Sequence, residues 1–209
     1  MYARYIKRGL DILLSFFILL ILLLPLLVMT VLGAIIMRGN PFFCQTRPGK
    51  NGKLFKLIKF RSMTNKYDAS GALLPDAQRL TKYGQFIRAT SLDELPEFLN
   101  ILIGNMSFIG PRPLLVEYLP YYTKEENRRH EVLPGLTGLA QVNGRNGLSW
   151  EQRFALDVQY VDTISFLGDL KIVFLTVKAV FCRSGVQVDT AQQEGNFAQM
   201  RKAQLEEIK

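Results

Sequence analysis

The sequence predicts a mainly α-helical α+β protein with an apolar N-terminal membrane segment over residues 1–38. Three observations support this fold class: an uncharged run over residues 12–37, a β-hairpin pattern after it, and helical spacing of apolar residues beyond. The length of 209 residues suits one domain plus an accessory element. We therefore expect a compact cytosolic domain over residues 39–186 with interfacial helices, and a loose, polar C-terminal tail over residues 187–209.

The net charge of +8 is unevenly distributed along the chain. The first 66 residues hold eleven Lys or Arg and one acid, Asp11, whereas the remaining 143 residues hold fifteen bases and seventeen acids. A basic block beside an apolar run indicates an anionic membrane surface, so we expect membrane lipid as a partner and no nucleic acid. Cys44 and Cys182 are far apart and have neither metal-binding nor redox spacing.

The uncharged run is long enough to cross a membrane. As a straight helix, its 26 residues would extend roughly 39 Å, against a hydrocarbon core of ~30 Å. Pro25 follows Leu24 at the centre of the run, where proline removes a hydrogen bond and clashes with the preceding turn. Both flanks are basic, which favours both ends on the cytoplasmic side. These residues support a spanning helix and a re-entrant helix-break-helix equally, and Ser15, Thr30 or burial would have to satisfy the carbonyls that Pro25 frees.

Two strands are expected after the membrane segment. Residues 41–45 and 54–61 flank a glycine-containing turn, which is a hairpin signal. At period two, Lys59 and Arg61 lie on one face of the second strand as paired cations.

Helical patterns and turn signals divide the rest of the chain. Helices are expected over residues 76–89, from Ser91 onward, over 124–132, over 149–161 and over 164–181, with a polar, glycine-rich loop over 138–147. Ser149 and Gln152 form the capping-box pattern of a helix start. The last of these helices could be interfacial or part of the core.

The adjacent acids Asp93 and Glu94 have two interpretations. In the first, Ser91 caps a helix, Glu94 completes a capping box, and Asp93 is favourable at the positive helix end. Pro96 fits the first turns of such a helix poorly. In the second, one carboxylate attacks phosphorus and its neighbour holds Mg²⁺, which prefers oxygen ligands and substrate phosphates. Cations that could bind the phosphate oxygens are available: Lys59, Arg88, Arg112 and Arg145.

Two further titratable residues need an explanation. Asp157 falls on the apolar face of the helix over residues 149–161, so it must be paired, lie at the rim or take part in chemistry. His130 is the only histidine and lies in a charged segment. We interpret it as part of a solvated helix face rather than a catalytic base, which argues against a His-centred hydrolase triad.

Several motifs occur in an order that resembles one known family. They are K-F-R-S-M at 59–63, R-x-x-S-L-D-E-L-P at 88–96, G-N-M-S-F-I-G-P-R-P at 104–113 and P-G-L-T-G-L-A-Q-V-N-G-R at 134–145, followed by Asp157 and D-L-K-I at 169–172. Over residues 1–186 the chain resembles the bacterial sugar transferases, the monotopic phosphoglycosyl transferases. Within that family, residues 112–120 and 143–150 look closest to the branch that starts bacterial protein N-glycosylation and uses UDP-N,N′-diacetylbacillosamine.

The resemblance implies an enzyme that moves a sugar 1-phosphate from a UDP-sugar to undecaprenyl phosphate and releases UMP. In the family, the aspartate that matches Asp93 forms a covalent phosphosugar intermediate in a ping-pong reaction, and the partner that matches Glu94 is associated with Mg²⁺. The membrane element is re-entrant, on the cytoplasmic face of the bacterial inner membrane, and no obligate protein partner is expected. Residues in the shared motifs become further site candidates: Arg61, Gln141, Asn143, Asp157 and Asp169.

The chain departs from the family pattern at three positions. Leu24 stands before Pro25 where serine is frequent, Leu139 replaces a frequent tryptophan, and Glu97 replaces a frequent glutamine. Two other classes stay open on the residues alone. They are a phosphatase that passes through the same aspartyl intermediate and a membrane-surface adaptor in which Asp93 and Glu94 only cap a helix.

Overall fold

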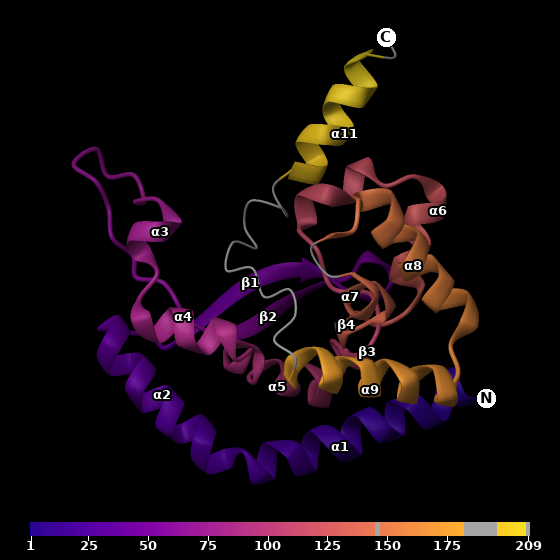
Figure 1. Ribbon diagram of the computed structural model, residues 1–209, viewed down its shortest axis with the longest axis horizontal. Helices are drawn as coiled ribbons and strands as arrows, with labels where there is room; N and C mark the ends of the chain where they lie inside the picture. Colours follow the sequence, from indigo (N-terminus) through magenta and orange to yellow (C-terminus); the bar gives the residue numbers. More distant parts are fainter. Residues whose placement is uncertain (145–146, 182–195, 208–209) are drawn as a thin grey trace.

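The computed structural model describes residues 1–144, 147–181 and 196–207. They form a mainly helical fold with two small two-stranded sheets, which confirms the mainly α-helical α+β class. In Figure 1, helices α1 (Lys7–Ile21) and α2 (Leu23–Met37) form the lower edge of the molecule, and the remaining elements pack above them. A short π-helix, η1 (Tyr2–Ile6), precedes α1.

The helix pair α1–α2 is bent by 65° at Leu22. The bend lies upstream of the expected break at Leu24 and Pro25, because a proline ring clashes with the carbonyl four residues earlier, here at Ile21. Pro25 itself is therefore accommodated in the first turn of α2. Among the described helices, none alone is long and apolar enough to cross a membrane, although the bent pair would be by length and composition.

The hydroxyl groups of Ser15 and Thr30 do not serve the bend. Ser15 Oγ donates to the Asp11 carbonyl at 2.6 Å, and Thr30 Oγ1 donates to the Leu26 carbonyl at 2.7 Å. Each therefore bonds within its own helix, and the expectation that they satisfy carbonyls freed by Pro25 is wrong.

The inner side of α1 is tied to the domain by polar contacts. Arg8 donates to the carbonyls of Ile101 and Leu102 at 2.6 and 2.9 Å, at the C-terminal end of α5 (Glu97–Ile103). Gly104 ends that helix at φ +98°, where a side chain would be strained and would also meet Arg8. The carboxylate of Asp11 accepts the Phe108 N–H at 3.1 Å. The bonds of Arg8 hold α1 against α5, and the bond of the buried Asp11 ties α1 to Phe108.

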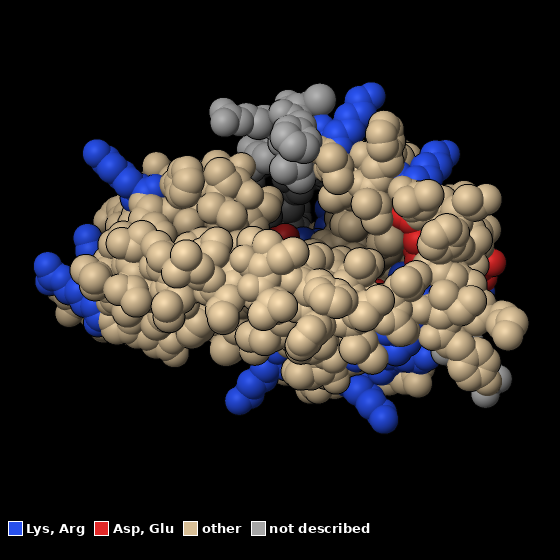
Figure 2. All heavy atoms as spheres, turned by 90° about the horizontal axis from the view of Figure 1, so that it is seen from below, with Lys and Arg blue, Asp and Glu red and all other residues tan. Residues whose placement is uncertain are grey.

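The outer side of the bent pair and of α9 (Phe166–Phe181) exposes large apolar side chains. Figure 2 views this side from below and shows a broad uncharged band with Lys and Arg around its edges. We call it the apolar face; its residues are Ile12, Leu13, Leu14, Phe16, Phe17, Leu20, Ile21, Leu23, Leu24, Leu27, Val28, Val31, Leu32, Ile35 and Ile36 of the pair, and Phe166, Leu167, Leu170, Val173, Phe174 and Val177 of α9.

The predicted hairpin is confirmed. Strands β1 (Phe42–Pro48) and β2 (Leu54–Phe60) pair antiparallel around a short 3-10 turn, η2 (Lys50–Gly52). Phe55 and Leu57 of β2 are buried against Ile101 and Met106. The side chain of Asn100, fully buried in α5, donates to the Lys56 carbonyl at 2.8 Å and accepts the Ile58 N–H at 3.0 Å. This amide fastens α5 to β2.

A second, parallel pair joins β3 (Ser107–Ile109) to β4 (Gly135–Thr137), with Ser107 opposite Gly135. Short helices fill the remaining chain: α3 (Asp76–Arg79), α4 (Lys82–Ala89), η3 (Leu92–Glu94), η4 (Val116–Tyr121), α6 (Lys124–Asn127), η5 (Arg128–Glu131) and α7 (Leu139–Asn143). The helix expected over residues 76–89 is thus two helices, because the Thr81 hydroxyl accepts the Gly84 N–H and starts a new one. The helix expected over residues 124–132 changes to 3-10 geometry at Arg128.

The capping box of α8 (Trp150–Thr163) is confirmed, because Ser149 and Gln152 exchange both side chain–backbone bonds. An aromatic cluster surrounds this helix and includes Tyr118, Tyr122, Trp150, Phe154 and Phe197. Phe197 belongs to α11 (Asn196–Glu207) and is fully buried. The expectation of a loose tail is therefore wrong for residues 196–207, since one aromatic side chain anchors an otherwise polar helix.

A buried ion pair links α8 to η5. The Oδ2 atom of Asp157 accepts two hydrogen bonds from Arg129, at 3.0 Å from Nε and 2.8 Å from the terminal nitrogen. Both side chains are 2% exposed. Pairing with Arg129 thus explains why Asp157 lies on the apolar side of α8.

We predict that Asp157→Asn lowers the free energy of unfolding by about 3 kcal/mol, because it leaves the Arg129 charge buried without a counter-charge. The matched control is Asp162→Asn, which removes the exposed partner of Arg128 and should change the stability little. Thermal unfolding in detergent measures both. Equal shifts of the two midpoints would contradict this account.

Candidate active site

Asp93 and Glu94 lie in the short 3-10 turn η3, not at a capped helix start. Ser91 precedes the turn in the left-handed region, at φ 56° and ψ 18°, and its side chain makes no capping bond. The predicted capping box is therefore wrong. Pro96 lies just before α5, where its missing N–H removes no helix bond. The left-handed conformation of Ser91 is strained for a non-glycine residue. Such strain is common where a site needs particular side-chain directions.

Glu94 reaches two cations instead of a backbone N–H. Its Oε1 accepts from Lys59 Nζ and from an Arg112 terminal nitrogen, each at 2.8 Å. Burial disfavours the charged form of Glu94, but Lys59 and Arg112 outweigh it and hold the pKa of Glu94 well below its usual range. Glu94 is therefore ionised at neutral pH.

The pKa of Asp93 is shifted in the opposite direction. Burial, followed by the adjacent charge of Glu94, raises the pKa of Asp93 to about 6. The charges of Lys59, Arg88 and Arg112 oppose this rise. A carboxylate with this pKa is ionised above pH 6 and is more basic than an ordinary aspartate, which suits a nucleophile.

Three separate elements bring the cations to the acids. Lys59 comes from β2, Arg112 from the loop after β3, and Arg88 from α4. Arg88 Nε donates to the buried Ser62 hydroxyl at 2.9 Å. Gly84 allows α4 this close approach, because a Cβ there would lie 1.9 Å from the Ser62 carbonyl oxygen. The geometry thus brings Lys59 and Arg112 to Glu94, and the charge of Arg88 acts on Asp93.

Three other predicted site residues donate to backbone carbonyls instead of to Asp93 or Glu94. Arg61 Nε donates to the Met63 carbonyl at 2.8 Å. Gln141 and Asn143 donate to the carbonyls of Leu136 and Leu139, at 3.1 and 2.8 Å. Arg145 lies outside the described residues.

Asp157 and Asp169 belong to buried networks of their own. Arg129, the partner of Asp157, also donates to the Arg112 carbonyl at 2.8 Å, so this pair supports the loop that carries Arg112. Asp169 accepts from the Tyr2 hydroxyl at 2.7 Å, Lys7 Nζ at 2.8 Å and the Tyr160 hydroxyl at 2.9 Å. That network joins the N-terminal segment to α8 and α9.

His130 is buried, so its interpretation as a solvated residue is wrong. Its ring packs against Tyr122 with centroids 5.3 Å apart, and Nδ1 lies 3.1 Å from Asn127 Oδ1. Burial and the charge of Arg129 lower the pKa of His130 to about 4. A neutral, enclosed imidazole of this kind supports packing.

The sequence reasoning gave no role to Glu97, which the structure places in the carboxylate cluster. Its Oε1 lies 3.2 Å from Lys59 Nζ, and the residue is 2% exposed. The spacing of three residues from Glu94 was the available signal, since such residues share one side of a helical turn.

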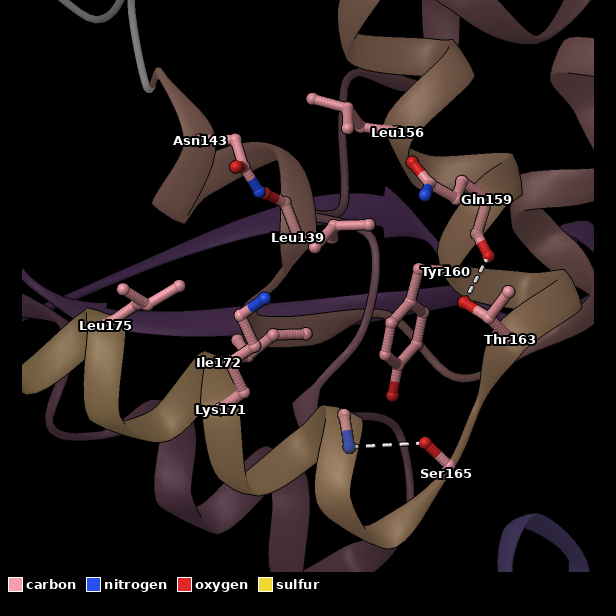
Figure 3. Close-up of a pocket in the computed structure, with 11 residues that line it drawn as sticks. Leu139, Asn143, Leu156, Gln159, Tyr160, Thr163, Ser165, Lys171, Ile172 and Leu175 are labelled. Atoms are coloured by element: carbon pink, nitrogen blue, oxygen red, sulfur yellow. Dashed lines mark hydrogen bonds between the residues drawn. The ribbon is translucent and has the colours of Figure 1, made fainter.

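A cavity of about 260 Å³ lies between α7, α8 and α9, apart from the carboxylate cluster. Figure 3 shows Ile172 and Leu175 of α9 on the left and the ring of Tyr160 of α8 on the right, with Leu139 of α7 between and above them. Two of its polar groups are bonded locally: Thr163 donates to the Gln159 carbonyl, and Ser165 accepts the Gly168 N–H. None of the lining residues belongs to the acid–cation cluster.

The acids suit a metal only together with a substrate. Among the described residues, no group of three or more His, Cys, Asp or Glu side chains could enclose an ion. Mg²⁺ needs no such cage, because it commonly binds one or two carboxylates together with substrate phosphates and water. The bonds from Lys59 and Arg112 both fall on Oε1 of Glu94, and its side chain is 21% exposed. Oε2 of Glu94 could therefore bind Mg²⁺ together with a substrate phosphate and water.

Comparison with known proteins gives a consistent picture. A sugar transferase of Bacillus subtilis, EpsL, is 59% identical over 150 residues, which cover 71% of this chain and 74% of EpsL. The UDP-glucose:undecaprenyl-phosphate glucose-1-phosphate transferase of Escherichia coli is 43% identical over 83% of this chain and 40% of its own length. The undecaprenyl-phosphate galactose phosphotransferase of Salmonella typhimurium is 37% identical over 88% of this chain and 42% of its own length. The chain thus spans about two fifths of these last two relatives.

The bacterial sugar transferase family model matches residues 2–183, which include both acids and all the cations of the site. The chain therefore belongs to the bacterial sugar transferase family.

Proposed function

We propose that this protein transfers a sugar 1-phosphate from a UDP-sugar to undecaprenyl phosphate and releases UMP. The observation that carries the proposal is the Asp93–Glu94 pair, in which one carboxylate is basic and the other is held ionised by its bonds to Lys59 and Arg112. The names of the Escherichia coli and Salmonella relatives state reactions of this class.

The reaction would take two steps at one phosphorus atom. An oxygen of the Asp93 carboxylate attacks the β-phosphorus of the UDP-sugar, the bond to the bridging oxygen breaks, and UMP leaves with that oxygen. The sugar 1-phosphate is then bound to Asp93 as an acyl phosphate. A phosphate oxygen of undecaprenyl phosphate attacks the same phosphorus, and the Asp93 carboxylate is released.

The surrounding residues have distinct roles in this proposal. Lys59, Arg88 and Arg112 bind the equatorial phosphate oxygens and neutralise their charge. Glu94 would hold Mg²⁺, which offsets the charge of the donor diphosphate when it is bound.

The apolar face supports attachment to a membrane. It combines α1, α2 and α9 in one uncharged surface with basic residues at its margin (Figure 2). We propose that α1 and α2 enter and leave one leaflet as a re-entrant pair, on the cytoplasmic face of the bacterial inner membrane. The lipid acceptor would then reach Asp93 along the membrane surface.

For the donor we propose UDP-N,N′-diacetylbacillosamine, and thus the first membrane step of protein N-glycosylation. The support is the resemblance over residues 112–120 and 143–150. UMP release across a panel of UDP-sugars tests this choice, and a preference for UDP-glucose or UDP-galactose would refute it.

We predict that Asp93→Asn lowers UMP release by about 10³-fold or more, because an amide cannot act as the nucleophile. The substitution keeps the size of the side chain, so the thermal midpoint should stay close to that of the wild type. Turnover that survives in this variant would contradict the proposed role. Wild-type turnover with water as the acceptor would instead indicate a phosphatase.

The re-entrant arrangement predicts that both ends of the helix pair face the same side. Single cysteines placed at Ala3 and Asn40, in a Cys44→Ser and Cys182→Ser background, should both resist a membrane-impermeant thiol reagent applied outside spheroplasts. Both should react after permeabilisation, which is the control for accessibility. Labelling of one position only before permeabilisation would indicate a spanning helix.

A further inference from the structure

Glu97 is a buried acid that the proposed reaction does not use. It is the first residue of α5 and is 2% exposed. Its Oε1 lies within ion-pair range of Lys59, at 3.2 Å, but accepts no hydrogen bond from the described residues. Because a buried carboxylate oxygen without a hydrogen bond is unfavourable, its presence beside the site needs a reason.

Lys59 lies between two carboxylates that differ in their other partners. Its ammonium donates to Glu94 Oε1 at 2.8 Å and lies 3.2 Å from Glu97 Oε1. Glu94 is also bonded to Arg112, so it stays paired if Lys59 moves away. For Glu97, Lys59 is the one cation in ion-pair range among the residues that the structure describes. A lysine ammonium has three donors on a flexible stem, so a small rotation can exchange its acceptors.

We propose that Glu97 is a positioning residue that gives the Lys59 ammonium a second binding place. When the diphosphate of the donor reaches Asp93, Lys59 leaves Glu94 and lies between Glu97 and the phosphate. Both buried carboxylates then keep a counter-charge, Glu94 from Arg112 and Glu97 from Lys59. This inference rests on the proposed function, because it requires a donor phosphate beside Asp93.

The ionisation of Glu97 supports the proposal and supplies its signature. Burial raises the pKa of Glu97 to about 7; Lys59 opposes the rise and the charge of Glu94 adds to it. The charged groups that face Glu97 are Lys59 from β2, Glu94 from η3 and Arg112 from the loop after β3. Above pH 7 the carboxylate is ionised and attracts Lys59, whereas below pH 7 it is protonated and does not.

An ordinary structural role is the alternative. An acid in the first turn of a helix interacts favourably with the helix dipole. In that case Glu97→Gln would change the stability, but the folded variant would have the same kcat/KM as the wild type at every pH.

The first test compares kcat/KM for UMP release at pH 8 and pH 6, with the UDP-sugar selected by the donor panel. Glu97→Gln removes the charge with almost no change in volume and should lie about tenfold below the wild type at pH 8. At pH 6 the two should lie within about twofold of each other, because most of the wild-type Glu97 is then protonated. Protonation of Asp93 affects both enzymes alike and cancels in the ratio.

Two further variants calibrate this comparison. Glu97→Asp keeps a carboxylate and should stay within about threefold of the wild type at pH 8. Glu117→Gln, which alters an exposed acid of η4, should match the wild type at both pH values. Thermal unfolding shows that each variant is folded.

The second test needs no turnover. An amine-reactive reagent labels neutral lysine, and peptide mass spectrometry follows the rate at Lys59. Burial lowers the pKa of Lys59, and the charges of Glu94 and Glu97 outweigh it and raise this pKa, so Glu97→Gln should make labelling about threefold faster at pH 8. Glu117→Gln should leave the rate unchanged.

A wild-type to Glu97→Gln ratio that is the same at pH 8 and pH 6 would overturn the proposal, as would unchanged labelling of Lys59. Failure of the proposed function would look different. UMP release would then be absent from the wild type, or it would persist in Asp93→Asn.

Discussion

One oxygen of Glu94 organises the site. It accepts hydrogen bonds from Lys59 and Arg112, which arrive from a strand and from a loop separated by about fifty residues of chain. The strand is fastened to α5 by Asn100, and the loop is supported by the Arg129–Asp157 pair through the Arg112 carbonyl. Loss of this shared acceptor would break both of these bonds to η3 and leave Glu97 as the carboxylate beside Lys59.

The same contacts make two adjacent acids chemically different. Glu94 is held ionised by the cations that touch it, whereas burial and the charge of Glu94 raise the pKa of Asp93. In the proposed reaction this asymmetry divides the work between a nucleophile and a metal-binding partner. The contacts of Arg8 with the end of α5 hold α1 against the helix that follows Pro96.

Local patterns in the sequence predicted the elements that local forces determine. Alternation and turn residues identified the hairpin, and Ser149 with Gln152 identified the start of α8. The ordered motifs also drew attention to Lys59, Glu94 and Arg112, which the structure joins by hydrogen bonds. Predictions failed where tertiary contacts outweighed local preferences. Glu94 binds two cations instead of completing a capping box, and Phe197 anchors the polar helix α11 in the aromatic cluster. The break fell at Leu22 because the clash of Pro25 acts one turn upstream. Glu97 was missed because its role depends on burial.

The most direct test of the central claim is a search for the sugar phosphate on Asp93. The enzyme is incubated with the UDP-sugar and Mg²⁺ in the absence of undecaprenyl phosphate, and its peptides are analysed by mass spectrometry. We predict one sugar phosphate on Asp93 for each UMP released, and its loss when undecaprenyl phosphate is added. Release of UMP only when both substrates are present, with no adduct on Asp93, would contradict the account.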